Sequence, residues 1–271
     1  MDRLTRVLTY VIALAMLSGC EHENPLSLEL EGNVQMVRMP GAVQGISAVC
    51  MPQMEIDLRP AGVMDLMVTN SYVFFPRMEN KMQMQTIINQ ATPQNLVLDA
   101  HTVTIEGAEM TLEANTTAGP LAGAPLQNTS WNTPFSAQLE PAEFKGSRFT
   151  LIPPNVGDEL RNRFSGQYTA MQRILIDIKL YAKMADGTRL QSNTLRYPID
   201  LCWGCLVSLP FSQPGVGLDP EQTFSVCNTK LVDPLFTPPC MPGNDEYLPC
   251  TFYCFMCDQD SSCDEQFCPN P

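Results

Sequence analysis

The clearest pattern in the chain is an alternation of apolar and polar residues over 173–184. Every second residue from Ile174 to Ala182 is apolar, and most of the residues between them are polar, which predicts a strand with one buried face. Asp186-Gly187 follows, a dipeptide that favours a tight hairpin turn, and the alternation then resumes over 188–201. The pattern therefore predicts a long antiparallel hairpin.

Shorter strands are predicted elsewhere, separated by segments rich in turn residues. Over 95–112 the alternation changes phase at Gly107, which indicates a β-bulge or turn. Further strands are predicted at 63–75, 135–139 and 149–152, a long connection at 114–134 and one short helix at 158–164. The fold class expected is mainly β: an antiparallel β-sandwich, for which an immunoglobulin-like architecture is one arrangement, with a disulfide-rich, loop-dominated C-terminal module.

The first twenty residues have the pattern of an export signal. Arg3 and Arg6 precede a mostly apolar stretch, Val7–Leu17, which is shorter than the ~20 residues that cross a bilayer as a helix. The stretch ends in Leu17-Ser18-Gly19-Cys20, which closely resembles the lipobox of bacterial lipoproteins.

Resemblance to lipobox-bearing lipoproteins implies that residues 1–19 are a signal peptide and that Cys20 carries acyl chains such as palmitate. Two or more chains anchor a protein stably, so the lipid alone is expected to hold it on the membrane of the bacterial cell envelope. Glu21 follows Cys20 where an Asp would favour the inner membrane, so the resemblance implies the outer membrane. Residues 20–33 are expected to be a lipidated tether.

Charge and composition narrow the class of partner. A net charge of −13 repels phosphate backbones, which argues against nucleic-acid binding. A hydrophobic content of 44% argues for a folded chain with its own core. The only histidines are His22 and His101, and few catalytic schemes that use imidazole are open to this chain.

Cysteine usage supports export to an oxidising compartment. With Cys20 lipidated, ten of the eleven cysteines remain, an even number that allows five disulfides. The candidates are Cys50, Cys202, Cys205, Cys227, Cys240, Cys250, Cys254, Cys257, Cys263 and Cys268. We expect a β-sandwich domain at 34–210 and an acidic Cys- and Pro-rich module at 211–271, with Cys50 bonded to one of the distal cysteines.

Two C-x-x-C pairs, Cys202/Cys205 and Cys254/Cys257, allow alternatives to structural disulfides. A thioredoxin-like redox site places its pair at a helix N-terminus, but Pro210 and Pro214 prevent a long helix after the first pair. The four thiolates together can bind zinc, although their spacing is far from that of a compact ribbon. Structural disulfides are the favoured interpretation.

Metal binding is weighed at two other places. Asp258, Asp260 and Asp264 can offer oxygen ligands to Ca²⁺, although Cys263 and Pro269 occupy positions where an EF-hand loop needs Gly and Glu. Nine methionines between residues 36 and 84 can offer thioethers to Cu⁺, but core packing is the favoured role.

His101 follows Asp99 by two residues, a spacing that places both on one face of a strand. Without a nucleophile motif, His101 is interpreted as a strand-surface histidine rather than a general base. No catalytic residue is predicted.

The function expected is that of a non-enzymatic envelope lipoprotein with a structural or protein- or ligand-interaction role. Its partners are the membrane, through the lipid anchor, and an envelope or surface protein; no cofactor is expected. The first alternative is a metal-binding lipoprotein that takes Cu⁺ or Ca²⁺. The second is an enzyme or thiol redox protein that uses carboxylates or cysteines.

Overall fold

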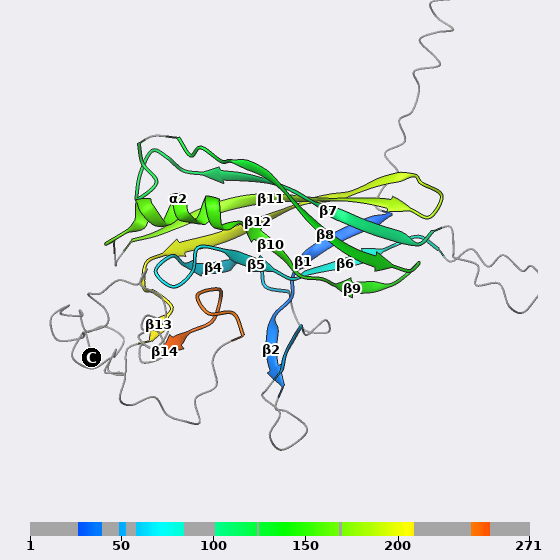
Figure 1. Cartoon of the computed structure of the whole chain (residues 1–271), viewed down its shortest axis with the longest axis horizontal. Coiled ribbons are helices and arrows are strands. Elements are labelled where there is room, and N and C mark those ends of the chain that lie inside the picture. The colour runs from blue at the N-terminus through cyan, green and yellow to red at the C-terminus, as the bar shows by residue number, and fades with distance from the viewer. Residues whose placement is uncertain are drawn as a thin grey trace, which may run out of the picture.

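The computed structural model describes residues 27–39, 49–52, 58–83, 101–123, 125–167, 170–208 and 240–249. Strands make up most of the regular structure (Figure 1). The elements are β1 (Leu28–Asn33), β2 (Met36–Met39), β3 (Val49–Pro52), β4 (Gly62–Asp65), β5 (Tyr72–Phe74), β6 (Pro76–Asn80), β7 (Val103–Ala114), β8 (Ser130–Leu139), β9 (Phe144–Gly146), β10 (Phe149–Ile152), α2 (Pro154–Phe164), β11 (Met171–Met184), β12 (Arg189–Cys202), β13 (Val207–Ser208) and β14 (Leu248–Pro249). The prediction of a mainly β fold with antiparallel sheets is confirmed.

The largest sheet has five strands in the order β4-β12-β11-β7-β8. Its strands are antiparallel except for β4, which runs parallel to β12. Strands β11 and β12 form the predicted long hairpin. At its turn Gly187 has a φ of +93°, and the Asp186 carboxylate accepts a hydrogen bond from the Thr188 N–H.

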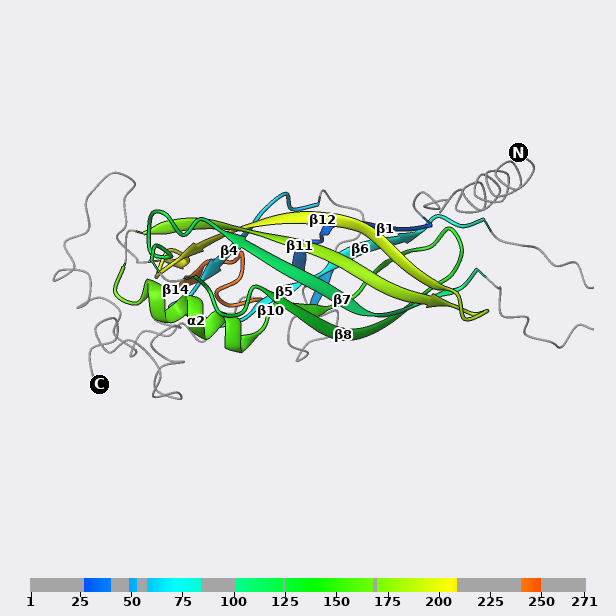
Figure 2. The same ribbon diagram turned by 90° about the horizontal axis from the view of Figure 1, so that it is seen from above.

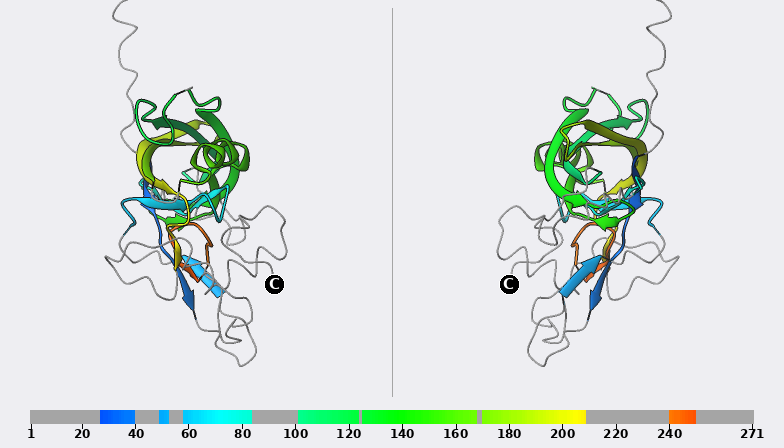
Figure 3. Two further views of the ribbon diagram at one scale, coloured as in Figure 1. Left: turned by 90° about the vertical axis from the view of Figure 1, so that its left-hand side faces the viewer. Right: turned by 90° about the vertical axis from the view of Figure 1, so that its right-hand side faces the viewer.

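The inner face of this sheet carries the core. Ile174, Ile176, Ile178 and Leu180 of β11 are fully buried, as the alternation predicts. They belong to one cluster with residues of α2 and of the smaller sheets β1-β6-β9 and β10-β5. Figure 3, seen along the long strands, shows these sheets wrapped around a common interior. An immunoglobulin-like strand arrangement stays a prediction.

Side chains, rather than backbone pairing, join the sheets at two seams. At one seam the Asn193 amide of β12 accepts a hydrogen bond from the Leu30 N–H (2.7 Å) and donates one to the Leu30 carbonyl (2.9 Å). At the other, Trp131 and Thr133 of β8 donate to carbonyl oxygens of β10 at 3.0 and 3.1 Å. These bonds give partners to backbone groups of β1 and β10, which are edge strands of their own sheets.

The predicted irregularity at Gly107 is present. The pairing register of β7 with β8 shifts between Ile105 and Gly107, and the register of β11 with β7 shifts between Tyr181 and Ala182. A further shift separates Lys179 and Tyr181 in the pairing of β11 with β12. The irregularities lie side by side in neighbouring strands, where bulges increase the local bend and twist of a sheet.

The described helix, α2, begins earlier than the predicted 158–164. Two prolines, Pro153 and Pro154, stand at its start, where a missing backbone N–H is tolerated. Its buried residues include Leu160 and Phe164, which belong to the core. Gly157 lies so close to the Asn70 carbonyl that a Cβ at this position would clash with it. No helix among the described residues has the length and apolarity needed to span a membrane.

The predicted tether over residues 20–33 needs correction at its end. Residues 28–33 form β1, which pairs with β6, and the side chains of Leu28 and Leu30 are buried in the core. The polar residues that suggested a spacer, Glu29 and Glu31, alternate with these leucines. The segment is therefore an amphipathic strand of the domain.

The boundary predicted at residue 210 also needs correction. Residues 240–249, assigned to a separate module, belong to the β domain: β14 pairs with β13, and Asp65 N–H donates to the Gly243 carbonyl at 2.8 Å. Leu248 is fully buried. The predicted connection at 114–134 likewise ends early, because β8 begins at Ser130.

Candidate functional sites

Buried polar side chains meet where residues 240–249 pack on the sheets. Tyr72 Oη donates to Asp245 Oδ2 at 2.5 Å and lies 3.4 Å from Tyr197 Oη. Asn33 Nδ2 donates to Tyr197 Oη at 3.1 Å, and Arg59 lies 3.5 Å from the Asp245 carboxylate. We call Asn33, Arg59, Tyr72, Tyr197 and Asp245 the polar junction.

The electrostatics of the polar junction favour uncharged tyrosines. Burial, together with the nearby Asp245, raises the pKa of Tyr72 well above its ordinary value. Burial raises the pKa of Tyr197 to about 12. Burial also raises the pKa of Asp245, against the opposing effect of its hydrogen bond from Tyr72. A cavity of about 20 Å³ beside the junction has room for a water molecule. The polar junction is therefore suited to a structural role, in which it holds together segments that are distant in the sequence.

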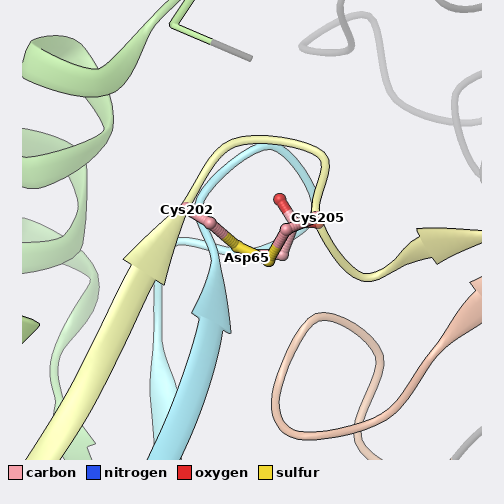
Figure 4. A group of neighbouring side chains, drawn as sticks. All are labelled: Asp65, Cys202 and Cys205. Carbon is pink, nitrogen blue, oxygen red and sulfur yellow. A yellow bond between two sulfur atoms is a disulfide. The ribbon is translucent and has the colours of Figure 1, made fainter. Parts of the chain in front are cut away.

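A second buried carboxylate, Asp65, lies beside the Cys202–Cys205 disulfide at the end of β12 (Figure 4). Asp65 Oδ1 accepts hydrogen bonds from the N–H groups of Gly204 (2.7 Å) and Met67 (3.0 Å), and Oδ2 accepts one from Leu206 (2.9 Å). Burial raises the pKa of Asp65, and these backbone N–H groups oppose the rise. Because the two sulfurs are bonded to each other, this group offers no thiolate to a metal.

The two described disulfides restrict the chain to different extents. Cys50–Cys240 spans 190 residues, and this pairing confirms that Cys50 bonds to a distal cysteine. Cys202–Cys205 closes a loop with a separation of 3 residues. In the chain-entropy model the long bridge stabilises the fold by about 5 kcal/mol and the short one by about 2 kcal/mol.

A hollow of about 460 Å³ opens on the outer face of the five-stranded sheet. This volume falls in the range of small-molecule sites, ~300–1,000 Å³. We call it the outer hollow; its polar lining consists of Glu106, Glu109, Asn132, Lys179, Tyr181, Arg189 and Gln191. It lies where the register irregularities of β7, β11 and β12 coincide.

Tyr181 and Gly107 shape the outer hollow. They are register partners, and a Cβ at residue 107 would clash with the Tyr181 hydroxyl and lie 2.8 Å from the Thr133 carbonyl oxygen. Glycine at this position therefore lets the Tyr181 ring lie across β7 toward β8. The sequence indicated the irregularity at Gly107 but not the hollow that forms around it.

Charges in and outside the outer hollow differ in how they are paired. Elsewhere on this face, Arg173 bonds Asp200 through two contacts (2.8 and 2.7 Å) and Arg196 bonds Asp177 through two (both 2.8 Å). Within the described part of the chain, none of the charged residues that line the hollow makes an ion pair or side-chain hydrogen bond; they are Glu106, Glu109, Lys179 and Arg189. Among the described residues, the hollow therefore presents charges of both signs that no ion pair engages.

An acidic group of β1 and β6 forms ion pairs with neighbouring cations. Glu29, Glu31 and Glu79 bring carboxylate oxygens within 4.8 Å of one another. Arg77 forms an ion pair with Glu31, and Lys81 forms ion pairs with Glu29 and Glu79. These pairs occupy carboxylate oxygens that a cation would need.

Several predicted site residues lie outside the described residues. They are the lipidation site Cys20, the calcium candidates Asp258, Asp260 and Asp264, and the cysteines Cys227, Cys250, Cys254, Cys257, Cys263 and Cys268. Their roles stay predictions. The disulfide prediction for Cys50, Cys202, Cys205 and Cys240 is confirmed.

The methionines considered for Cu⁺ divide between interior and surface. Met64, Met67 and Met78 are buried in the core, in the role that gap-filling predicts, whereas Met51 is 50% exposed. His101 stands in a turn before β7, and its Nδ1 lies 2.7 Å from the Gln83 carbonyl oxygen. His101 was expected on the surface of a strand, but it lies just before β7, and Asp99 lies outside the described residues.

Comparison with known proteins adds no family to these observations: no family model, no curated protein and no solved structure matches the chain. Functional inference for this protein therefore rests on its own residues.

Proposed function

We propose that this protein is a lipid-anchored lipoprotein of the bacterial outer membrane with a binding role, and that the outer hollow is its binding site. The resemblance of Leu17–Cys20 to a lipobox supports the anchor. The single observation that carries the binding role is a set of charges around a concave surface that make no ion pair with the described residues: Glu106, Glu109, Lys179 and Arg189.

The anchor and the outer hollow lie toward the same end of the domain. Ser27, at the start of the fold, accepts a hydrogen bond from Lys81 N–H, and Asn80 in turn donates to the His101 carbonyl. Ala185 of the hairpin turn donates to Thr102, next to His101. Figure 2 shows the start of β1 and the turn between β11 and β12 toward the same end of the molecule. The eight residues Cys20–Ser27 span at most about 28 Å, so a lipid on Cys20 would hold this end near the membrane.

The chemistry of the outer hollow favours a ligand or partner segment that presents charges of both signs. Glu106 and Glu109 come from β7, whereas Lys179 and Arg189 come from β11 and β12. Tyr181 adds an aromatic ring, and Asn132 and Gln191 add amides that donate and accept hydrogen bonds. A charged group in the hollow would form ion pairs with side chains that make none with the described residues.

The anchor is tested by Cys20→Ala. The variant removes the thiol that receives the lipid, so we expect it to leave the membrane fraction while the exported domain keeps its folded circular dichroism spectrum. Membrane fractionation of wild type and variant, with detergent extraction as a control, measures this. A variant that stays membrane-bound would contradict the proposed anchor.

The binding role is tested by placing a photo-crosslinking residue at Asn132, on the rim of the outer hollow, or at Thr111, exposed on the same face but outside the hollow. In cells we expect a discrete adduct from position 132 and none from position 111. Charge reversal at Lys179 and Arg189 should abolish the adduct. Equal labelling at both positions, or none at position 132, would refute the hollow as the site.

A further inference from the structure

The Cys202–Cys205 disulfide stands in a loop that other contacts already hold. Asp65 accepts hydrogen bonds from the N–H groups of Gly204 and Leu206, on the strand side and the far side of Cys205. The Leu206 carbonyl accepts a hydrogen bond from Leu248 N–H at 2.7 Å. The loop therefore keeps its path without the sulfur–sulfur bond, and reduction would leave the two thiols as neighbours.

The contribution of this bridge to folding is small compared with that of Cys50–Cys240, since it closes a loop of separation 3 rather than 190. A disulfide that is dispensable for the fold and kept in place by its surroundings is free to open and close. Its two sulfurs also differ in access: Cys202 is 1% exposed, whereas Cys205 is partly exposed.

The loop lies at the end of the molecule opposite Ser27. Strand β12 runs from the hairpin turn, near Ser27, to Cys202, and its 14 residues span roughly 45 Å. Figure 1 shows β13 and β14 toward that far end, below α2. With the anchor near Ser27, this end points away from the membrane.

We propose that Cys202–Cys205 is a site of reversible thiol–disulfide exchange with a dithiol protein of the envelope. The envelope location of the partner and the orientation of the loop rest on the proposed anchor, whereas the exchange at the two cysteines does not. Asp65 acts as a positioning residue, because it accepts hydrogen bonds from both sides of the Cys205 position in the disulfide-bonded loop.

The exchange balances in two steps. A thiolate of the partner attacks the accessible Cys205 Sγ, the bond between the two sulfurs of the loop breaks, and its electron pair passes to Cys202 Sγ, which takes a proton. The second thiolate of the partner then attacks the partner's own sulfur in the mixed disulfide and releases Cys205, which is protonated in turn. Two electrons and two protons thus move from the dithiol to this protein, and the reverse sequence oxidises the partner.

Asp65 is the carboxyl group beside the leaving sulfur. Its carboxylate oxygens and the two sulfurs form one group in which the nearest atoms of each pair lie within 4.8 Å. Burial raises the pKa of Asp65, and its hydrogen bonds from backbone N–H groups oppose that rise. The short distance between the Asp65 carboxylate and the two sulfurs supports the proposed exchange site, which rests on the geometry of the loop.

The test uses the mature, oxidised protein in detergent, with dithiothreitol as the probe. Aliquots are quenched by alkylation at successive times, and mass spectrometry of cysteine peptides follows each pair separately. We expect Cys202–Cys205 to open at least ~10-fold faster than Cys50–Cys240, with the circular dichroism spectrum unchanged. Cys50 and Cys240 are also partly exposed, so access alone does not produce this ratio. Equal rates, or opening only on unfolding, would overturn the proposal.

Variants separate positioning from stability. Cys202→Ser should trap glutathione on Cys205 as a stable mixed disulfide. Asp65→Asn should shift the equilibrium of the pair with a glutathione buffer toward the dithiol by about 10-fold, the equivalent of one charged hydrogen bond. Asp200→Asn, an aspartate change on β12 outside the loop, should shift it less than ~2-fold. An unchanged equilibrium in folded Asp65→Asn would overturn the positioning role. If that variant does not fold, the ratio of the two opening rates in wild type still tests whether Cys202–Cys205 is the exchange site.

Discussion

The apolar interior between the long strands and the polar junction are both buried, but they are built in opposite ways. In the interior, Ile174, Ile176 and Ile178 come from one strand and share a face because strand side chains alternate. In the junction, Asn33, Tyr72 and Asp245 come from three distant segments. The interior gains stability from apolar burial, whereas the junction depends on each buried polar group finding a partner.

The apolar interior and the polar junction therefore differ in how readily they accept substitutions. An apolar core accepts side chains of similar volume, since dispersion and burial are not directional. The polar junction accepts few changes, because loss of one partner leaves another group desolvated without a hydrogen bond. It therefore determines where residues 240–249 dock, while the core supplies most of the stability.

The largest effect is expected in the interior. Ile178→Ala removes a fully buried side chain at the centre of β11 and leaves a cavity, which should lower the free energy of unfolding by about 2–5 kcal/mol. Urea unfolding followed by circular dichroism measures the loss. The neighbouring change Lys179→Ala, on the outer face, should cost less than about 0.5 kcal/mol. Similar losses of stability in the two variants would show that the buried and the exposed face of β11 do not differ in this way.

A smaller loss is expected at the polar junction. Tyr72→Phe keeps the ring but removes the hydroxyl that donates to Asp245, which should cost about 1–3 kcal/mol because that carboxylate loses a buried partner. Tyr247, 72% exposed, offers the matched control Tyr247→Phe, for which no change is expected. A Tyr72→Phe variant as stable as wild type would show that the junction does not act as a hydrogen-bonded unit.

The polar junction should also make the stability of the protein depend on pH, through Asp245. Burial raises the pKa of Asp245, so its contribution to stability is fully present below the unfolded pKa and is lost as pH rises through the folded value. We therefore expect wild type to lose stability relative to Asp245→Asn as pH increases from 4 to 7. Urea midpoints of both proteins across this range test the sign. A relative gain by wild type with rising pH would contradict it.

The smallest effect is expected on the outer face, with the opposite sign. The hydrogen bond from Arg196 lowers the pKa of Asp177, so this contribution is present above the unfolded pKa and is lost as pH falls through the folded value. Because the side chain is 31% exposed, Asp177→Asn should cost less than about 1 kcal/mol at pH 7. Urea unfolding in low and high salt checks this, since salt should reduce the difference further. A salt-independent loss would indicate a packing role.

Prediction from sequence succeeded for segments with a regular local pattern. The hairpin of β11 and β12, its turn at Asp186-Gly187 and the irregularity at Gly107 are present as expected. It was wrong where polar composition concealed an amphipathic strand, as in β1, and where a distant segment returned to the sheet, as in residues 240–249. Among the candidate sites, the bond of Cys50 to a distal cysteine was predicted, whereas the buried Asp65 and the outer hollow were not.

The sequence by itself determined the fold class, the buried face of the long hairpin and the expectation of an anchor at Cys20, because each depends on residues that are neighbours in the chain. Only the tertiary structure decided that Cys50 pairs with Cys240, that Tyr72 donates a hydrogen bond to Asp245 and that four charged side chains gather around Tyr181. Local alternation directly reports which face of a strand is buried. Contacts between segments up to 190 residues apart depend on how the whole chain closes around its core, and no local pattern records that.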